Sequence, residues 1–422
     1  MKNLLYIVFG LLILSLGGCT RDESNIFSIS PAERLSNALK VDKDSLVNAK
    51  NGWVMEYFAT TASAGYTMLV KFNKSGQVIV SGKSELTGNV LFSDSSLYEM
   101  IGDDGPVLTF NSYNKVLHAF SNPELPDGYG LEGDYEFIVM KNTADQIILK
   151  GKKRGTTILL NKLPQNITKE QYFAGLDAMD SLLFYKNSLK LKMNIGALTY
   201  SFTNGTYHVF SIIKDGAGAN IAVDAPFVVT QTGIRFHSVQ ELGGMKFQTL
   251  TLNEDKSALV SLDNSDLKLI GVDDLAAYLT ASIKVWQFTP VGLSSNVEVL
   301  YDQIIQSCKA KYNAEDVKLA IRYYSTRRSF ELTLSYVSGM VLSEGNLDFS
   351  LTATGKNSLS LLYKGTGDTS GLSFYNDVAG LKDFSTLIST AFNLGTACMI
   401  NPQRIKFTKK TDANTWFSLG AE

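Results

Sequence analysis

Residues 66–80 read YTMLVKFNKSGQVIV, and this stretch decides the fold class. Every second residue from Tyr66 to Phe72 is aromatic or apolar, the turn residues 74–76 follow, and Val78 and Val80 resume the alternation. A period of two is the pattern of a β-strand that buries one face. Two such strands joined by a short turn predict an antiparallel hairpin.

The same alternation recurs along the chain between segments with a helical period. Further strands are predicted at 107–110, 115–120, 135–140, 146–151, 156–160, 198–203, 246–252, 258–262, 267–270, 319–324, 329–336, 347–352, 358–363, 404–407 and 416–419. A two-residue hairpin turn is predicted at Asn204-Gly205. Helices are predicted to start at Ser30 and Thr168, where capping boxes occur, with others at 296–312 and near 384–392. We therefore predict an α+β, β-rich fold of antiparallel meanders, as a sheet or partly open barrel, each preceded by a packed helix.

The N-terminus has the pattern of a bacterial lipoprotein leader. Residues 4–16 are apolar except for a Gly and a Ser, and they are too few to span a bilayer, which takes about 20. Leu16-Gly17-Gly18-Cys19 resembles the lipobox, in which the Cys is acylated. This predicts lipid attachment at Cys19; a short N-terminal anchor with a chance Cys is the alternative. Acidic residues 22–23 resemble the export tag of surface-exposed lipoproteins in the Bacteroidetes, and a periplasm-facing tether is the alternative.

The order of helix and then meander predicts three units behind this leader. The predicted organisation is a signal peptide at 1–18, an acidic tether at 19–29, a first helix-plus-meander unit at 30–165, a second at 166–290 and a third α+β unit at 291–422. Trp53 follows Gly52 where the helical period gives way to the strand period. We expect Trp53 in the core, packed on the helix that begins at Ser30, and the opposite strand face, which carries Glu56, in water.

Several segments together resemble a known family. They are the lipobox, Asn51-Gly52-Trp53 with Glu56-Tyr57, and residues 66–72, 133–137, 149–153 and 232–236. Their order resembles the Bacteroidetes surface lipoprotein family known as domain of unknown function 4302, over most of the mature chain. The family has no assigned activity and so implies no catalytic residues. The resemblance implies an outer-membrane or cell-surface lipoprotein that is an accessory to nutrient uptake.

Composition and motifs exclude several classes of chemistry. The net charge of −2 over 422 residues offers no electrostatic reason for nucleic-acid binding. Three His and three Cys occur without an H-E-x-x-H, C-x-x-C or G-x-S-x-G motif, so we predict no metal, no cofactor and no nucleophilic triad. His118, His208 and His237 are interpreted as ordinary strand residues. Residues 128–133 match G-x-G-x-x-G, but a predicted strand follows them where a dinucleotide site needs a helix.

A few residues remain as candidates for binding or catalysis. The adjacent acids Asp103-Asp104 and Asp273-Asp274 are the visible carboxylate pairs. The candidate sugar-stacking aromatics are Trp286, Trp416, Tyr113 and Tyr129, of which the two tyrosines lie in predicted turns. Cys308 and Cys398 are expected as buried free thiols, with a disulfide between them as the alternative.

These observations favour a non-enzymatic binding protein of the cell envelope. We predict an outer-membrane, lipid-anchored and surface-exposed protein that binds a ligand or partner in nutrient acquisition. Its expected partners are the membrane, outer-membrane uptake proteins and a glycan or peptide ligand. An envelope hydrolase that acts through carboxylates and a structural or adhesive surface protein are the alternatives. A deep cleft with two facing acids would favour the hydrolase, and a shallow aromatic platform would favour binding.

Overall fold

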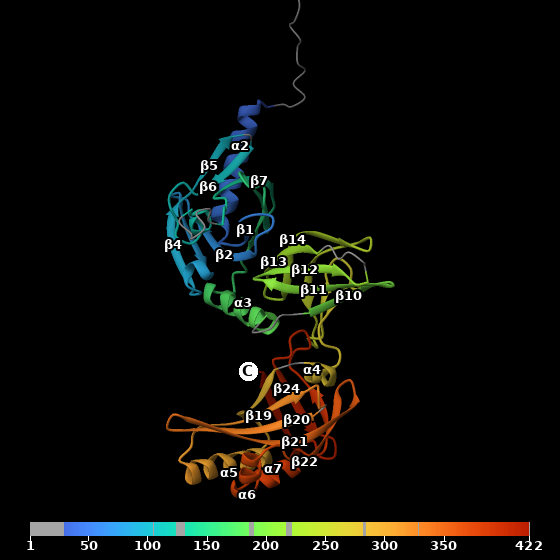
Figure 1. The fold of residues 1–422 in the computed structure, drawn as a ribbon. Coiled ribbons are helices and arrows are strands. Elements are labelled where there is room, and N and C mark those ends of the chain that lie inside the picture. The colour runs from blue at the N-terminus through green and yellow to red at the C-terminus, as the bar shows by residue number, and fades with distance from the viewer. Residues whose placement is uncertain are drawn as a thin grey trace, which may run out of the picture.

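The computed structural model describes residues 29–103, 105–123, 131–184, 190–216, 222–281, 284–327 and 329–421. Cys19, the signal peptide 1–18 and Tyr129 lie outside these ranges, as does all of the tether except Ile29. The described chain forms three successive antiparallel β structures, so the predicted β-rich α+β class is confirmed (Figure 1). None of its helices is long and apolar enough to cross a membrane.

The first unit is an antiparallel sheet in the order β4-β3-β2-β1-β9-β8-β7-β6-β5. Its strands are β1 (Trp53–Phe58), β2 (Gly65–Phe72), β3 (Gln77–Gly82), β4 (Phe92–Leu97), β5 (Glu99–Asp103), β6 (Gly105–Thr109), β7 (Glu136–Asn142), β8 (Gln146–Gly151) and β9 (Thr157–Lys162). Two short 3₁₀-helices, η1 (Glu85–Thr87) and η2 (His118–Ser121), interrupt the order. The hairpin predicted from residues 66–80 is β2–β3, in which Val70 pairs with Val80. The central strand β1 pairs with both β2 and β9.

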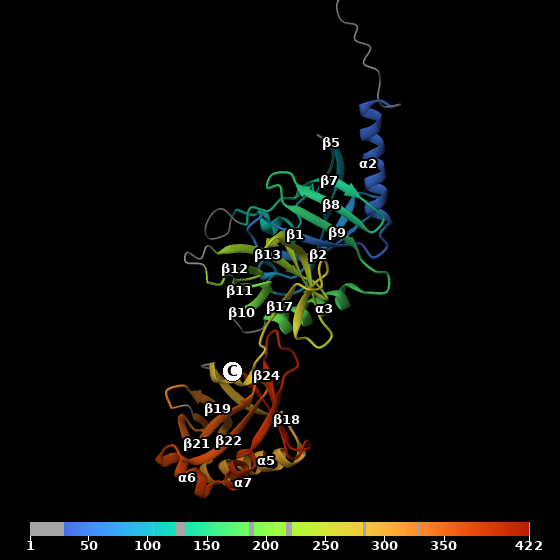
Figure 2. The ribbon, with the colours of Figure 1, turned by 90° about the vertical axis from the view of Figure 1, so that its right-hand side faces the viewer.

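Helix α2 (Pro31–Asn48) packs along the first sheet, next to β5 and β6 (Figure 2). It begins where predicted, and the side-chain oxygen of Ser30 accepts a hydrogen bond from the Glu33 backbone at 3.2 Å. Trp53 is 1% exposed, and its indole nitrogen donates to the backbone oxygen of Leu46 in this helix at 3.0 Å. The expectation that Trp53 lies in the core against the first helix is confirmed.

The second unit is helix α3 (Lys169–Phe184) followed by a closed barrel, which we name the second barrel after its unit. The barrel strands are β10 (Lys190–Ile195), β11 (Leu198–Thr206), β12 (Val209–Lys214), β13 (Val223–Val229), β14 (Gly233–Leu242), β15 (Met245–Leu252), β16 (Ala258–Ser261) and β17 (Lys268–Ile270). A loop from the third unit completes the barrel core, because Cys398 and Ile400 are buried among its side chains. Cys308 is buried in a different core, and both thiols are free.

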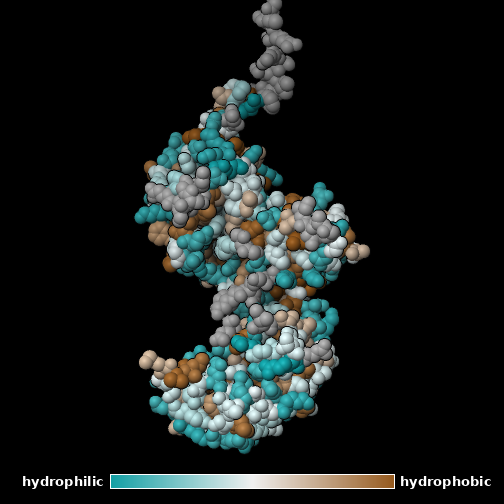
Figure 3. Space-filling view, in the orientation of Figure 1, coloured by the Kyte–Doolittle hydropathy of each residue, from teal (hydrophilic) through white to brown (hydrophobic). Residues whose placement is uncertain are grey.

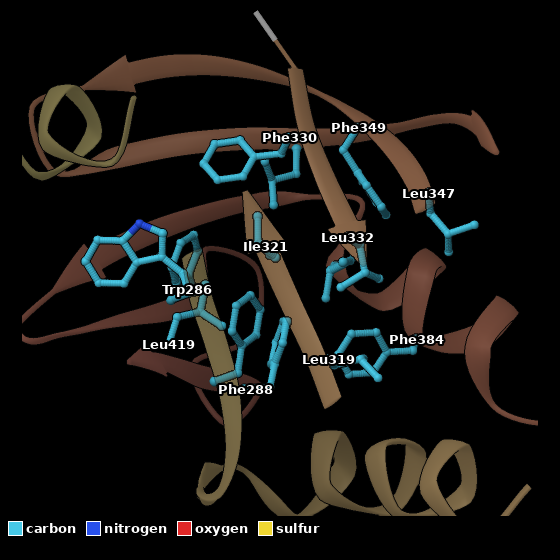
Figure 4. Packing of buried hydrophobic residues seen from close by; sticks show 14 of the residues in the cluster. Trp286, Phe288, Leu319, Ile321, Phe330, Leu332, Leu347, Phe349, Phe384 and Leu419 are labelled. Carbon is cyan, nitrogen blue, oxygen red and sulfur yellow. The ribbon is translucent and has the colours of Figure 1, made fainter. Parts of the chain in front are cut away.

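The third unit is also a closed barrel, which we name the third barrel after its unit; most of its helices lie at one end, and the short helix Leu275–Ala281 lies at the other (Figure 1). Its elements are α4 (Leu275–Ala281), β18 (Val285–Leu293), α5 (Ser295–Tyr312), β19 (Glu315–Tyr324), β20 (Ser329–Ser338), β21 (Val341–Gly355), β22 (Ser358–Thr366), α6 (Thr369–Asp377), α7 (Leu381–Ile388), β23 (Ala391–Gly395), β24 (Arg404–Lys409) and β25 (Trp416–Ala421). Aromatic and aliphatic side chains from the strands and from α7 fill the interior, among them Trp286, Phe288 and Phe384 (Figure 4). The projecting β20–β21 hairpin carries an exposed apolar tip at Met340, Val341 and Leu342 (Figure 3).

Three local predictions of secondary structure were wrong. Residues 115–120 form no strand: the Asn114 side chain accepts from the backbone N–H groups of Val116 and Leu117 at 3.0 and 3.2 Å, and this turns the chain into η2. Asn204-Gly205 lies within β11, beside an irregularity in its pairing with β12, and the turn falls at residues 207–208. The last helix ends at Ile388, since residues 391–395 pair with β22 and β24.

Candidate functional site

The first sheet and the second barrel are joined through a buried ion pair. Glu56 on β1 is 7% exposed, so the expectation that its strand face is in water was wrong. The barrel covers this face, and Arg235 Nη1 on β14 lies 2.8 Å from Glu56 Oε2. Asn161 donates to the other carboxylate oxygen at 3.0 Å. Burial raises the pKa of Glu56, and Arg235 and Asn161 oppose that shift.

Apolar contacts extend this junction on either side of the ion pair. Val54, Leu69 and Leu163 of the first unit form a buried cluster with Phe173 and Leu176 of α3. Helix α3 therefore packs on the first sheet as well as on its own barrel, where it contacts β13.

Gly65 at the start of β2 shows how closely the two units approach. A Cβ atom there would stand 2.4 Å from Val228 Cγ1 on β13 and 2.7 Å from the Phe227 backbone oxygen. A side chain at this position would force the sheet and the barrel apart, so the absence of a side chain on Gly65 permits the junction.

A cleft of about 610 Å³ opens beside this junction. Its walls come from three segments that are remote in sequence: β2 with the loop after β3, helix α3, and the turn between β11 and β12. The lining residues are Gly65, Tyr66, Thr67, Lys83, Ser84, Asn89, Phe173, Leu176, Asp177, Asp180, Tyr207, His208 and Val229. Pockets at the junction of two units, with apolar walls and a few polar groups, are the usual place for a ligand.

An ion pair and a hydrogen bond link helix α3 to the other walls of the cleft. Asp177 lies 2.8 Å from Lys83 Nζ, and Asp180 Oδ1 lies 2.7 Å from His208 Nε2. The other ring nitrogen of His208 lies 3.2 Å from the Gly65 backbone oxygen. Through its two ring nitrogens, His208 links helix α3 to the start of β2.

Two tyrosines supply the aromatic part of the cleft. Tyr207 is 52% exposed, and its ring stacks on that of His208 with centroids 3.7 Å apart. Partial desolvation, then Asp180, Glu85 and Asp177, raises the pKa of Tyr207. Burial also raises the pKa of Tyr66, whose hydroxyl donates to Glu85. Three carboxylates thus surround an exposed aromatic face, and this local field favours hydrogen-bond donors and disfavours anions.

The described members of the carboxylate pairs suggested by the sequence each have an ion-pair or hydrogen-bond partner. Asp103 pairs with Lys152 at 2.9 Å, and Asp104 lies outside the described residues. Asp273 pairs with Lys356 at 2.9 Å, while Asp274 accepts from the backbone of Ala277 at the start of α4.

The candidate histidines and aromatics are scattered. Of the described residues, no group of three or more His, Cys, Asp or Glu is arranged to hold a metal ion. His118 lies in η2 and not on a strand, and His237 packs against Phe58 with ring centroids 4.6 Å apart. Trp286 is a core residue, and Lys406 lies over the ring of Trp416 at 4.1 Å. The remaining candidate, Tyr113, is exposed.

The residues that form the cleft were missed by the sequence reasoning. Asp177 and Asp180 are three positions apart on the polar side of a predicted helix, where acids are commonly in water. Tyr207 lies two residues after the predicted hairpin turn at Asn204-Gly205, and no pattern around it indicates that it lines a binding site. The i, i+3 spacing of the two acids was the one signal present, since it puts both on the same helix face.

No curated protein matches the chain. Among solved structures, it is similar to the beta chain of DNA polymerase III from Streptococcus pneumoniae, at 11% identity over 92% of this chain and 97% of that one, with a TM-score of 0.14. It is likewise similar to the beta subunit of DNA polymerase from Streptococcus pyogenes, at 11% identity over 91% and 96% of the two chains, with a TM-score of 0.15. Scores this low carry no argument about function.

The family comparison covers more than half of the chain. Residues 23–254 match the model of a family described as Domain of unknown function (DUF4302). This range includes all of the first unit and the barrel strands from β10 to β15, and with them every residue that lines the cleft. The chain therefore belongs to the DUF4302 family.

Proposed function

We propose that this protein is a non-enzymatic, lipid-anchored envelope protein that binds a small ligand in the cleft between the first sheet and the second barrel. Its role is that of a surface-exposed accessory in nutrient acquisition at the outer membrane. The observation that carries the proposal is the exposed Tyr207 ring, held by stacking on His208 above a cleft with polar and apolar walls.

The cleft favours binding over hydrolysis. A carboxylate-based hydrolase needs one acid to give up a proton and a second carboxylate to act as base or nucleophile. Asp177 and Asp180 are the two acids that line the cleft, and each is held by a cationic or donor partner, Lys83 and His208. Neither acid performs these roles without first breaking its pair. Both pairs instead fix the cleft walls against each other.

The chemistry of the lining selects a neutral ligand with hydroxyl or amide groups. Tyr207 offers a flat apolar face, and the carboxylates around it accept hydrogen bonds. The carboxylates Asp177, Asp180 and Glu85 outnumber the one Lys among the described lining residues, Lys83, and this excess negative charge disfavours anions. Sugars and short peptides without net charge fit these requirements.

The binding proposal is tested by calorimetric titration of the chain from residue 20 onward. The probes are neutral mono- and disaccharides and uncharged di- and tripeptides. We expect one of these classes to bind, and Tyr207→Ala to weaken that binding about tenfold, the loss of about 1.4 kcal/mol for a buried aromatic contact. Met340→Ala, at the exposed hairpin tip in the third unit, is the control and should bind as the wild type does. Unchanged binding by Tyr207→Ala, or release of cleavage products from any probe, would refute the proposal.

The anchor is tested separately. Cys19→Ala should move the protein from the membrane fraction to the soluble envelope fraction, because stable anchoring by acyl chains depends on that thiol. Membrane retention of this variant, with no fatty acid on the wild type, would contradict lipidation.

A further inference from the structure

A second aromatic feature lies on the first unit, outside the cleft. Tyr113, His118 and Tyr135 form a cluster of three rings, which we name the platform: His118 stacks on Tyr135, and Tyr113 is tilted against His118. The ring centroids of Tyr113 and His118 are 5.3 Å apart, and those of His118 and Tyr135 are 4.7 Å apart. Tyr113 is 59% exposed and Tyr135 is 42% exposed. Single exposed aromatics are ordinary, whereas a cluster on a surface marks a binding site.

The backbone around the platform is held in place. Asn114 is fully buried, and its side chain donates to the Ser96 hydroxyl at 3.1 Å while accepting from two backbone N–H groups of the following turn. On the opposite side, the Phe110 N–H donates to the Tyr135 backbone oxygen at 3.1 Å. Both tyrosines therefore stand on fixed backbone, and a ligand would not have to order them.

His118 is the middle ring of the platform, and it is uncharged. Its Nδ1 accepts a hydrogen bond from the Asn114 N–H at 3.1 Å, so this nitrogen carries no proton. Burial lowers the pKa of His118, and the Phe110 backbone contact opposes that shift. The uncharged ring fills the space between the two tyrosines and keeps them apart at fixed separation.

The surroundings of the platform are hydroxyl and amide groups. The hollow beside it has a volume of about 580 Å³ and is lined by Phe110, Asn111, Ser112, Tyr113, His118, Ser121, Asn122, Pro123 and Tyr135. The carboxylate of Glu99 accepts a hydrogen bond from the Asn111 side-chain amide at 3.4 Å.

We propose that the platform binds a sugar ring of a neutral glycan by stacking it on Tyr113. One face of a pyranose carries C–H groups whose hydrogens are slightly positive, and the face of an aromatic ring is slightly negative. The sugar's hydroxyls point outward from that contact, toward the amides and hydroxyls of Asn111 and Ser112. The platform and the cleft share no residue, so the platform is a second and independent site.

Two other occupants fit the platform less well. A proline-rich peptide docks into slots between parallel aromatic ridges, and here His118 fills the space between the two tyrosines. A single-stranded nucleic acid also stacks on aromatics, but it needs a cationic groove along its backbone, and the lining of this hollow is hydroxyl, amide and aromatic.

The proposal is tested by electrophoresis through native gels that contain soluble starch, mixed-linkage β-glucan, xylan or mannan. We expect at least one neutral glycan to retard the wild type, Tyr113→Ala to weaken that retardation about tenfold, and Tyr113→Phe to keep it. Met340→Ala, at the exposed hairpin tip of the third unit and outside both sites, is the control and should leave the retardation unchanged. Because Tyr113 is mostly exposed, Tyr113→Ala should melt at the wild-type temperature.

Several results would overturn the proposal. They are no retardation of the wild type in any of the four gels, equal retardation of Tyr113→Ala, or binding of a polyproline peptide that Tyr113→Ala abolishes. The cleft is tested by calorimetry with small probes and Tyr207→Ala, so failure of one site is distinguished from failure of the other.

Discussion

Replacing Arg235 with Met should loosen the junction between the first sheet and the second barrel. The substitution leaves Glu56, which is 7% exposed, with a hydrogen bond from the Asn161 amide at 3.0 Å but without its cationic partner. Breaking a buried ion pair by removing one partner costs about 3–5 kcal/mol. Met retains most of the apolar contact of the Arg stem, and Asn161 still binds the carboxylate. We therefore expect a loss of about 3 kcal/mol, at the lower end of that range.

The loss should depend on pH in a defined direction. Burial raises the pKa of Glu56 in the folded protein, and removal of Arg235 raises it further. Between the unfolded and folded pKa the folded state then binds more protons than the unfolded state, so stability falls as pH rises through that window. Arg235→Met should be most destabilised at pH 8, and lowering the pH toward 5 should reduce the loss because Glu56 becomes protonated.

Urea unfolding followed by Trp53 fluorescence measures this effect. Trp286→Phe and Trp416→Phe in the third barrel leave Trp53 as the single reporter, and it lies in the core of the first unit. Glu56→Met with Arg235→Met should recover stability to within about 1 kcal/mol, since apolar replacement of a buried pair is often neutral. Arg154→Met, which removes an exposed pair with Glu132, is the control and should change stability by less than about 1 kcal/mol. The reasoning fails if Arg235→Met behaves like that control, or if the double variant is less stable than either single one.

Three further predictions concern the core, the histidines and the thiols. Trp53→Ala should lower the stability of the first unit by about 3–5 kcal/mol through lost burial and a cavity, and an unchanged urea midpoint would contradict its core position. Burial lowers the pKa of His118 and His237 from 6.5, so the folded state binds fewer protons and stability should fall as pH drops below about 6.5. His118→Phe should flatten that slope between pH 5 and 7 in thermal melts, and a slope equal to that of the wild type would show that His118 is not the cause. Burial raises the pKa of Cys308 to about 11, so neither it nor the buried Cys398 should react with a thiol reagent at pH 8 until urea is added; rapid labelling of the folded protein would mean that these thiols are accessible.

The strand and helix pattern could be predicted where local residues determine the structure. The hairpin of residues 66–80 alternates strictly, and the capping residues Ser30 and Thr168 stand directly before helices. The segment 115–120 has the same alternation and yet forms η2, because the buried Asn114 side chain offers its backbone an alternative set of hydrogen bonds. A pattern of apolar residues contains no information about such a bond.

The cleft could not be predicted, because it results from docking of distant segments. Lys83, Asp177 and Tyr207 come from three separate parts of the chain, and no spacing rule connects them. The prediction that Glu56 faces water was wrong for the same reason. A charged residue on a strand indicates a solvent-exposed face, and the sequence does not show that Arg235, 179 residues away, covers it. Only part of the platform could be predicted: Tyr113 was a candidate stacking residue in a predicted turn, whereas His118 and Tyr135 were predicted to be strand residues.

The loop of the third unit that enters the second barrel has a consequence for truncation. The family match ends at residue 254, before strands β16 and β17, although β17 closes the barrel by pairing with β10. A chain cut at 254 would expose the edges of β10 and β15 and would lack Cys398 and Ile400 in the barrel core. Open strand edges beside uncovered apolar surface promote aggregation. The boundaries of the sequence family and those of the smallest soluble folding unit are therefore different, and expression of this barrel requires the third unit as well.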